Sequence, residues 1–182
     1  MQNEVYGNQG RDRISQSQQM VAQELNGVLS HLQNAEMTFE QRGVRAATGE
    51  YTAAIRAADS IDQQAVARER DNVRQMLQSQ NLDAQTRRAL VQEDADLHTL
   101  QRAPGFARAN FALLMIRNGD QYYGTQLLLE AQQKDPEMNQ DPNFQRHLKN
   151  AIDAAPRAQQ QQGGYDQQQQ YQQPYDQQRQ QQ

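Results

Sequence analysis

The stretch FARANFALLMIRNGDQYYGTQLLLEAQQKDPEM, from Phe106 to Met138, is the most apolar part of the chain and predicts two helices joined by a tight turn. Pro104, just upstream, suits the first turn of a helix because proline has no N–H to leave unbonded there. Gly119 can adopt the left-handed conformation that ends a helix, and Asp120 can cap the next one. Two helices joined this closely pack antiparallel, so the stretch predicts a helical hairpin.

The hairpin resembles a tetratricopeptide (TPR) repeat, a helix pair of about 34 residues. The residues that carry the resemblance are Phe111-Ala112 for the usual Leu-Gly, Met115 for the Tyr, Gly119-Asp120 at the turn, Gly124 and Ala131 at the small positions, Leu128 at the large position, and Pro136 at the end. The chain departs from the pattern at Arg108, where the family prefers an aromatic residue. The resemblance implies that Gly124 and Ala131 lie where the two helices touch. The alternative is an ordinary helical hairpin of another all-α domain.

Two weaker hairpins are predicted before this one. An apolar stripe begins near Asp12 and predicts a packing helix or a coiled-coil-like dimer helix; its members are Ile14, Val21, Leu25, Val28, Leu29 and Leu32. Gly49 echoes the turn at Gly119, with Gly43 inside the preceding helix, and the two turns lie close to two repeat lengths apart. That spacing leaves room for a middle hairpin, whose second helix Asp83 would cap. Its stripes are Ile61, Val66, Val73, Met76 and Leu77 in the first helix and Leu90, Val91, Leu97 and Leu100 in the second.

A last helix is predicted to start at Asp141-Pro142 and to cover the end of the stack with one amphipathic face, made of Phe144, Leu148, Ala151 and Ile152. Residues 158–182 are a low-complexity tail of Gln with three Tyr, which cannot form a core, and we expect this tail and residues 1–11 to be disordered. The predicted architecture is therefore all-α: antiparallel helical hairpins stacked as a short TPR-like solenoid over residues 12–157, followed by a disordered Gln-rich tail.

Composition excludes several kinds of partner. Of the 182 residues, 36% are hydrophobic and the net charge is -4, which gives no electrostatic basis for binding nucleic acid or an anionic membrane. No apolar run is long enough to insert into a membrane, and the first residues lack a signal-peptide core, so a cytoplasmic location is the default expectation. The chain has no Cys, which removes disulfides, thiolate catalysis and thiolate metal sites.

Few residues suggest chemistry. Asp94 and His98 are separated by one helical turn and could share a metal ion, but a solvated acidic face explains them better because no second ligand pair occurs nearby. The sequence holds no glycine-rich phosphate loop and no nucleophile motif. We therefore expect neither an enzyme nor a cofactor.

The expected function is protein–protein interaction through a TPR-like scaffold or adaptor. The resemblance implies that the first helix of the hairpin lines a groove that holds a peptide, with Phe106, Asn110, Leu113 and Arg117 as the partner-binding residues. Asn110 stands where peptide-binding TPRs hold a peptide backbone, whereas Phe106 replaces the Lys of the carboxylate-clamp subtype. The alternative is a structural subunit of an oligomeric or cell-envelope assembly, with a self-associating Gln-rich tail and a homo-oligomeric state.

Overall fold

The structure is a computed structural model that describes residues 2–79 and 82–154, with side chains from residue 17 onward. Throughout these ranges the chain is helical or in short turns and contains no strand, so the all-α prediction is confirmed. The tail over 158–182, predicted to be disordered, lies outside the described residues.

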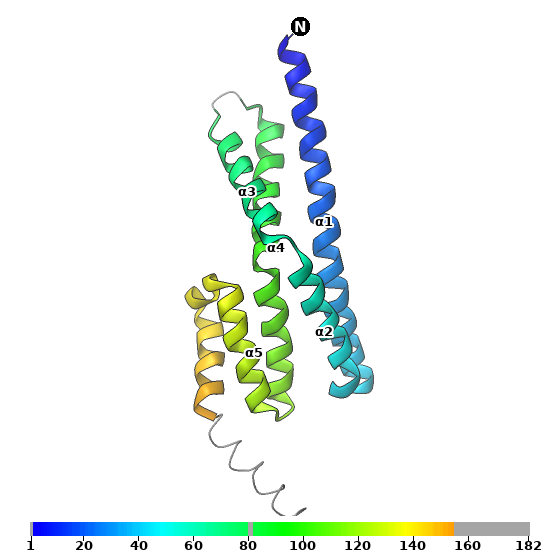
Figure 1. Cartoon of the computed structure of the whole chain (residues 1–182), viewed down its shortest axis with the longest axis vertical. Helices are drawn as coiled ribbons and strands as arrows, with labels where there is room; N and C mark the ends of the chain where they lie inside the picture. Colours follow the sequence, from blue (N-terminus) through cyan, green and yellow to red (C-terminus); the bar gives the residue numbers. More distant parts are fainter. Residues whose placement is uncertain (1, 80–81, 155–182) are drawn as a thin grey trace, which may run out of the picture.

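The central element is α4 (Ala84–Arg117), which runs through the middle of the molecule (Figure 1). On one side of it lie α1 (Gln2–Arg42) and α2 (Val44–Ser60), and α3 (Gln63–Leu77) packs on its N-terminal half. On the other side lie α5 (Gln121–Lys134), the short 3-10 helix η1 (Pro136–Gln140) and a last helix over residues 142–154. The first helix includes residues 2–11, which the sequence placed outside the helical domain.

The continuity of α4 corrects the prediction that a helix starts at Pro104. Pro104 lies inside α4, where it cannot donate to the carbonyl of Leu100, its helical partner four residues earlier. The side-chain amide of Gln63 on α3 donates to that carbonyl instead, at 3.3 Å. The second helix of the predicted middle hairpin and the first helix of the central hairpin are therefore two halves of one helix.

The first turn also differs from the prediction. The chain reverses at Gly43, which has φ of 79° and alone separates α1 from α2. Gly49 is an ordinary residue of α2 with open space around the position of a side chain. A single glycine inside a helix costs only about 1 kcal/mol relative to alanine, so helix packing can override it.

The remaining caps follow the sequence. Gly119 has φ of 90°, and Asp120 accepts a hydrogen bond from the backbone N–H of Tyr123 at 3.1 Å. Asp83 accepts from the backbone N–H groups of both Gln85 and Thr86 at 2.9 Å. The predicted turn at 118–120 and the predicted start of α4 are thus confirmed.

The α4–α5 contact depends on small residues, and Gly124 and Ala131 both lie in it. A Cβ on Gly124 would lie 2.5 Å from Ile116 Cγ1 and 2.9 Å from the Ala112 carbonyl oxygen, and Ala131 is fully buried. A second close approach was missed by the sequence: a Cβ on Gly105 would lie 2.4 Å from Asp135 Cβ. Either glycine must stay small for α5 to lie this close to α4.

The core between α2, α4 and α5 is aromatic and includes one buried arginine, Arg108. Tyr51 stacks on Phe111 with ring centres 5.2 Å apart, and Phe111 meets the edge of Tyr123. Arg108, which departs from the TPR pattern, is 8% exposed and donates to both carboxylate oxygens of Asp59 at 2.7 and 2.8 Å. It also pairs with Glu130 on α5 at 3.3 Å. Arg108 therefore joins three helices: α4, α2 through Asp59, and α5 through Glu130.

Candidate functional site: a groove along α4

An open groove of about 600 Å³ runs along α4, between α1 and the last helix. Its lining is mostly apolar, includes several polar side chains, and comes from five segments of the chain. The lining residues are Leu25, Val28 and Leu29 of α1; His98, Thr99, Arg102, Ala103, Phe106, Ala109, Asn110 and Leu113 of α4; Leu128 of α5; and Asp135, Met138, Asp141, Asn143, Phe144 and His147 beyond it.

The floor of the groove is one stripe of α4. Ala103, Phe106, Ala109 and Leu113 recur every three or four residues, so they lie on one face of the helix. Phe106 is 50% exposed although it sits in the most apolar part of the sequence. An uncovered aromatic side chain in a concave apolar surface is typical of a binding site.

Asn110 places a polar group in this stripe. Its side-chain N–H donates to the Phe106 carbonyl of its own helix at 2.9 Å, which fixes the carboxamide against α4. No described residue donates to its Oδ1, and its second N–H is likewise unused among them. An extended peptide in the groove would offer both a donor and an acceptor for these atoms.

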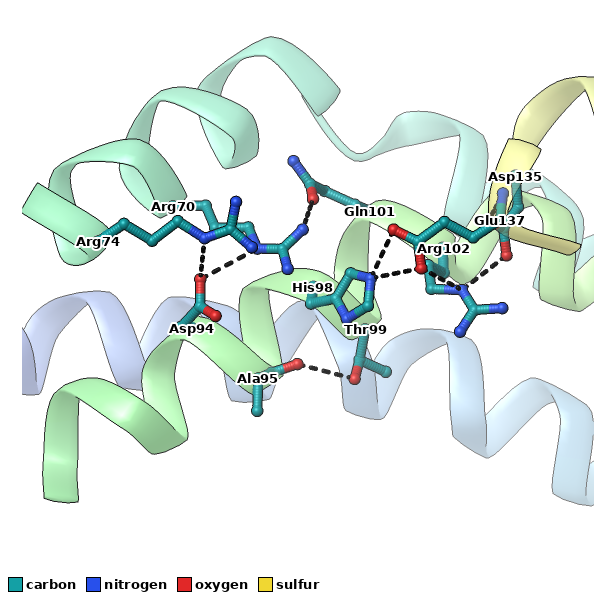
Figure 2. Close-up of polar contacts among 10 residues, drawn as sticks. All are labelled: Arg70, Arg74, Asp94, Ala95, His98, Thr99, Gln101, Arg102, Asp135 and Glu137. Atoms are coloured by element: carbon teal, nitrogen blue, oxygen red, sulfur yellow. Dashed lines mark hydrogen bonds and ion pairs between the residues drawn. The ribbon is translucent and has the colours of Figure 1, made fainter. Parts of the chain in front are cut away.

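Two ionic contacts involve lining residues at one end of the α4 stripe (Figure 2). Arg102 donates to Asp135 at 2.8 Å, and His98 Nε2 lies 2.9 Å from Glu137 Oε2. The hydrogen bond from His98 lowers the pKa of Glu137. The Asp135 side chain is 2% exposed and also accepts from the backbone N–H of Glu137, so it fixes the start of η1 against α4. The charges at this end are therefore largely satisfied within the protein.

A second ionic cluster continues along α4 toward α3. Arg70 and Arg74 both donate to the same oxygen of Asp94 at 3.0 Å, and Arg70 also donates to Gln101 (Figure 2). Asp94 and His98, considered above as a metal pair, thus bind different partners on different elements. Among the residues that the structure describes, no group of three His, Asp or Glu side chains is placed to hold a metal ion.

The structure gathers three of the four predicted partner-binding residues. Phe106, Asn110 and Leu113 all line the groove, whereas Arg117 is exposed one turn beyond it. Burial and then the charge of Glu36 raise the pKa of Tyr51, and the charge of Arg117 opposes that shift.

The walls of the groove were missed as site residues. Leu25 and Leu29 belong to the apolar stripe of the first helix, and Phe144 to the amphipathic face of the last one. Leu29 remains 42% exposed in the groove. The apolar periodicity marked all three residues, but periodicity does not tell which helices come together.

Comparison of the chain with protein-family models, curated proteins and solved structures found no significant match. None of the helices in the described part of the chain is both long and apolar enough to span a membrane.

Proposed function

We propose that this protein is a non-enzymatic interaction module whose groove along α4 binds an uncharged, apolar segment of a protein or peptide partner. The single observation that supports this proposal most is the exposed Phe106 in the groove floor, one turn from Asn110. Phe106 and Leu113 would anchor the apolar side chains of the partner, and Asn110 would bond its backbone.

The chemistry of the lining favours an uncharged partner segment. Arg102 and Asp135 neutralise each other, and Asp141 is used in capping the last helix, where it accepts from the Asn143 backbone N–H at 2.8 Å. Little unpaired charge is therefore left to attract an acidic or basic peptide, and the apolar contacts would supply most of the binding free energy.

We further propose that the C-terminal half of α4 and α5 form a TPR-like hairpin. The turn at Gly119, the close approach at Gly124 and the buried Ala131 agree with that resemblance. The unbroken passage of α4 through Pro104 departs from separate stacked hairpins, and so does the ion cluster of Arg108. In this scheme α4 belongs to two successive helix pairs, one with α3 and one with α5.

A displayed library of random peptides tests the proposal without knowledge of the natural partner. We expect peptides selected on the protein to carry apolar anchors, to lose most of their binding to Phe106→Ala, and to bind less tightly to Asn110→Ala. Val91→Ala is the matched control, because Val91 is an apolar residue of the same helix, 55% exposed and outside the groove. Selected peptides that bind all three variants alike would contradict a role for the groove, as would a library that yields no binder.

Pull-downs from a lysate of the source cells extend the same comparison to natural partners. A partner lost with both Phe106→Ala and Asn110→Ala but kept with Val91→Ala would be a groove ligand. A partner retained by every variant would bind elsewhere on the surface.

A second candidate function is a structural subunit that self-associates. Three large apolar side chains of α1 are well exposed, namely Met20 at 49%, Leu29 at 42% and Met37 at 51%. Such side chains favour association of copies when they meet a complementary surface. Sedimentation over a hundredfold range of concentration tests this candidate, and a monomer throughout would exclude it. Larger species that survive deletion of residues 158–182 would assign the association to the helices.

A further inference from the structure

We infer that the C-terminal tail over residues 158–182 is a ligand of the groove in its own molecule and competes there with outside partners, through Tyr165, Tyr171 and Tyr175. This inference rests on the proposed function, because it assumes that the groove accepts an uncharged peptide. Beyond the proposed function, it makes the tail a regulator of how tightly outside partners bind the groove.

The path of the chain brings the tail to the groove. The helix over 142–154 forms one wall through Phe144 and His147, and the chain leaves from that same helix. From His147 to residue 154 the helix advances only about 10 Å, at 1.5 Å per residue. Residues 155–164 can span up to about 35 Å when extended. The groove stripe from His98 to Leu113 is about 22 Å long by the same helical rise, so Tyr165 can reach any part of it.

The tail matches the groove in charge and in chemistry. Its charged residues are Asp166, Asp176 and Arg179, and nearly all the rest are Gln or Tyr. Tyr offers a large ring for an apolar floor and a hydroxyl for a polar edge. The lining of this groove includes Thr99, Asn110 and Asn143, which can exchange hydrogen bonds with hydroxyl and Gln amide groups.

The spacing of the tyrosines suits docking in an extended conformation. Tyr165, Tyr171 and Tyr175 follow one another at steps of six and four positions, both even numbers. Side chains of an extended chain alternate between two faces, so all three rings would point toward one side. Pro174 favours that conformation, since the residue before a proline is restricted to extended backbone.

Weak docking is enough for this role. A tethered segment faces its own site at an effective concentration of about 1 mM, so a Kd of about 0.1 mM would fill the groove about nine-tenths of the time. A segment composed mostly of Gln can still dock three Tyr side chains. An outside partner would then bind about tenfold more weakly to the intact chain than to a chain without the tyrosines.

Thiol labelling of the full chain tests the inference, because the sequence has no Cys and an engineered thiol is therefore unique. Leu113→Cys and Thr99→Cys place a reporter at either end of the groove stripe, and Gln133→Cys places one on the exposed face of α5, outside the groove. Each is made with the natural tail and with Tyr165→Ser, Tyr171→Ser and Tyr175→Ser together, and each is checked by circular dichroism. The measurement is the rate of reaction with a small thiol reagent.

We expect the three tail substitutions to raise the labelling rate in the groove about tenfold and to leave the rate at position 133 unchanged. Equal rates with and without the tyrosines at both groove positions would overturn the inference, and so would the same increase at position 133. Protection that disappears on dilution would also overturn it, because the tail of a second copy would then be the occupant. If library peptides bind the groove but the tail tyrosines do not change the labelling rate, only this inference is refuted. If the tail tyrosines do slow labelling but no library peptide binds, the groove binds its own tail and the proposed binding of outside partners is refuted.

Discussion

The side-chain amide of Gln63 donates to the backbone carbonyl of Leu100 at 3.3 Å, across the contact between α3 and α4. This carbonyl is the one that Pro104 deprives of its donor. A hydrogen bond from another helix thus replaces the one missing from α4, so the Leu100 carbonyl keeps a donor although the long helix that carries the groove floor passes through a proline.

The first prediction follows from this replacement. Gln63→Leu should destabilise the protein by about 1 kcal/mol, because the Leu100 carbonyl would lose its partner. In a Pro104→Ala background the new backbone N–H can serve the carbonyl, so the same substitution should cost much less there. Urea unfolding of the four proteins gives the coupling. Equal costs in both backgrounds would show that Gln63 does not act through Leu100.

Replacement of Gly124 and of Gly49 by alanine should change the free energy of unfolding in opposite directions. Gly124→Ala should destabilise by about 1–3 kcal/mol, since its Cβ would lie closer to Ile116 and to the Ala112 backbone than van der Waals contact allows. Gly49→Ala should stabilise by up to about 1 kcal/mol, because nothing lies within 4 Å and alanine favours helix. Both changes are measured as shifts in the free energy of unfolding. A stabilising Gly124→Ala would disprove the assigned α4–α5 contact.

Replacement of Gly124 by Leu extends this test with a control on the same helix. Gly124→Leu should cost on the order of 1–3 kcal/mol or more by overpacking. Gln133→Leu on the exposed face of α5 should be close to neutral. Similar losses at the two positions would mean that the faces of α5 are assigned incorrectly.

The ion pair between Arg108 and Asp59 should make the free energy of unfolding depend on pH in the acidic range. The hydrogen bond from Arg108 lowers the pKa of Asp59, and burial opposes that shift only in part. A carboxyl group whose pKa is lowered by folding adds stability above its unfolded pKa, near 4, and loses that contribution as the pH falls through its folded pKa. Urea titrations at pH 7 and at pH 3 should therefore show a smaller loss of stability in acid for Asp59→Asn than for the natural chain. The same acid loss in both proteins would remove Asp59 from the explanation.

The two phenylalanines of α4 should separate binding from folding. Phe111 is 1% exposed and stacks on Tyr51, so Phe111→Ala should cost about 3–5 kcal/mol. Phe106 is 50% exposed, so Phe106→Ala should cost no more than about 1 kcal/mol. Melting temperatures measure the difference. A Phe106→Ala protein as unstable as Phe111→Ala would show that Phe106 belongs to the core rather than to a binding surface.

The sequence predicted the features that neighbouring residues control. Gly119 with Asp120, and Asp83 before α4, act within one or two helical turns, so their caps are visible without a tertiary structure. The small residue Gly124 was recognisable because the TPR resemblance assigned it a place in the hairpin whose two helices are joined by the turn at Gly119.

Other features required partners that are distant in sequence. Gln63 and Leu100 are separated by 37 positions, so nothing local revealed that α4 could continue through Pro104. The choice between Gly43 and Gly49 as the first turn likewise depended on packing, since either glycine can end a helix. The groove itself joins Leu29, Phe106 and Phe144, three residues from separate helices. By itself the sequence determined where helices are stable and which faces are apolar, because those properties depend on residues three and four positions apart. Only the tertiary structure decided which apolar faces cover one another and which, like Phe106, stay open, because that depends on contacts between distant segments.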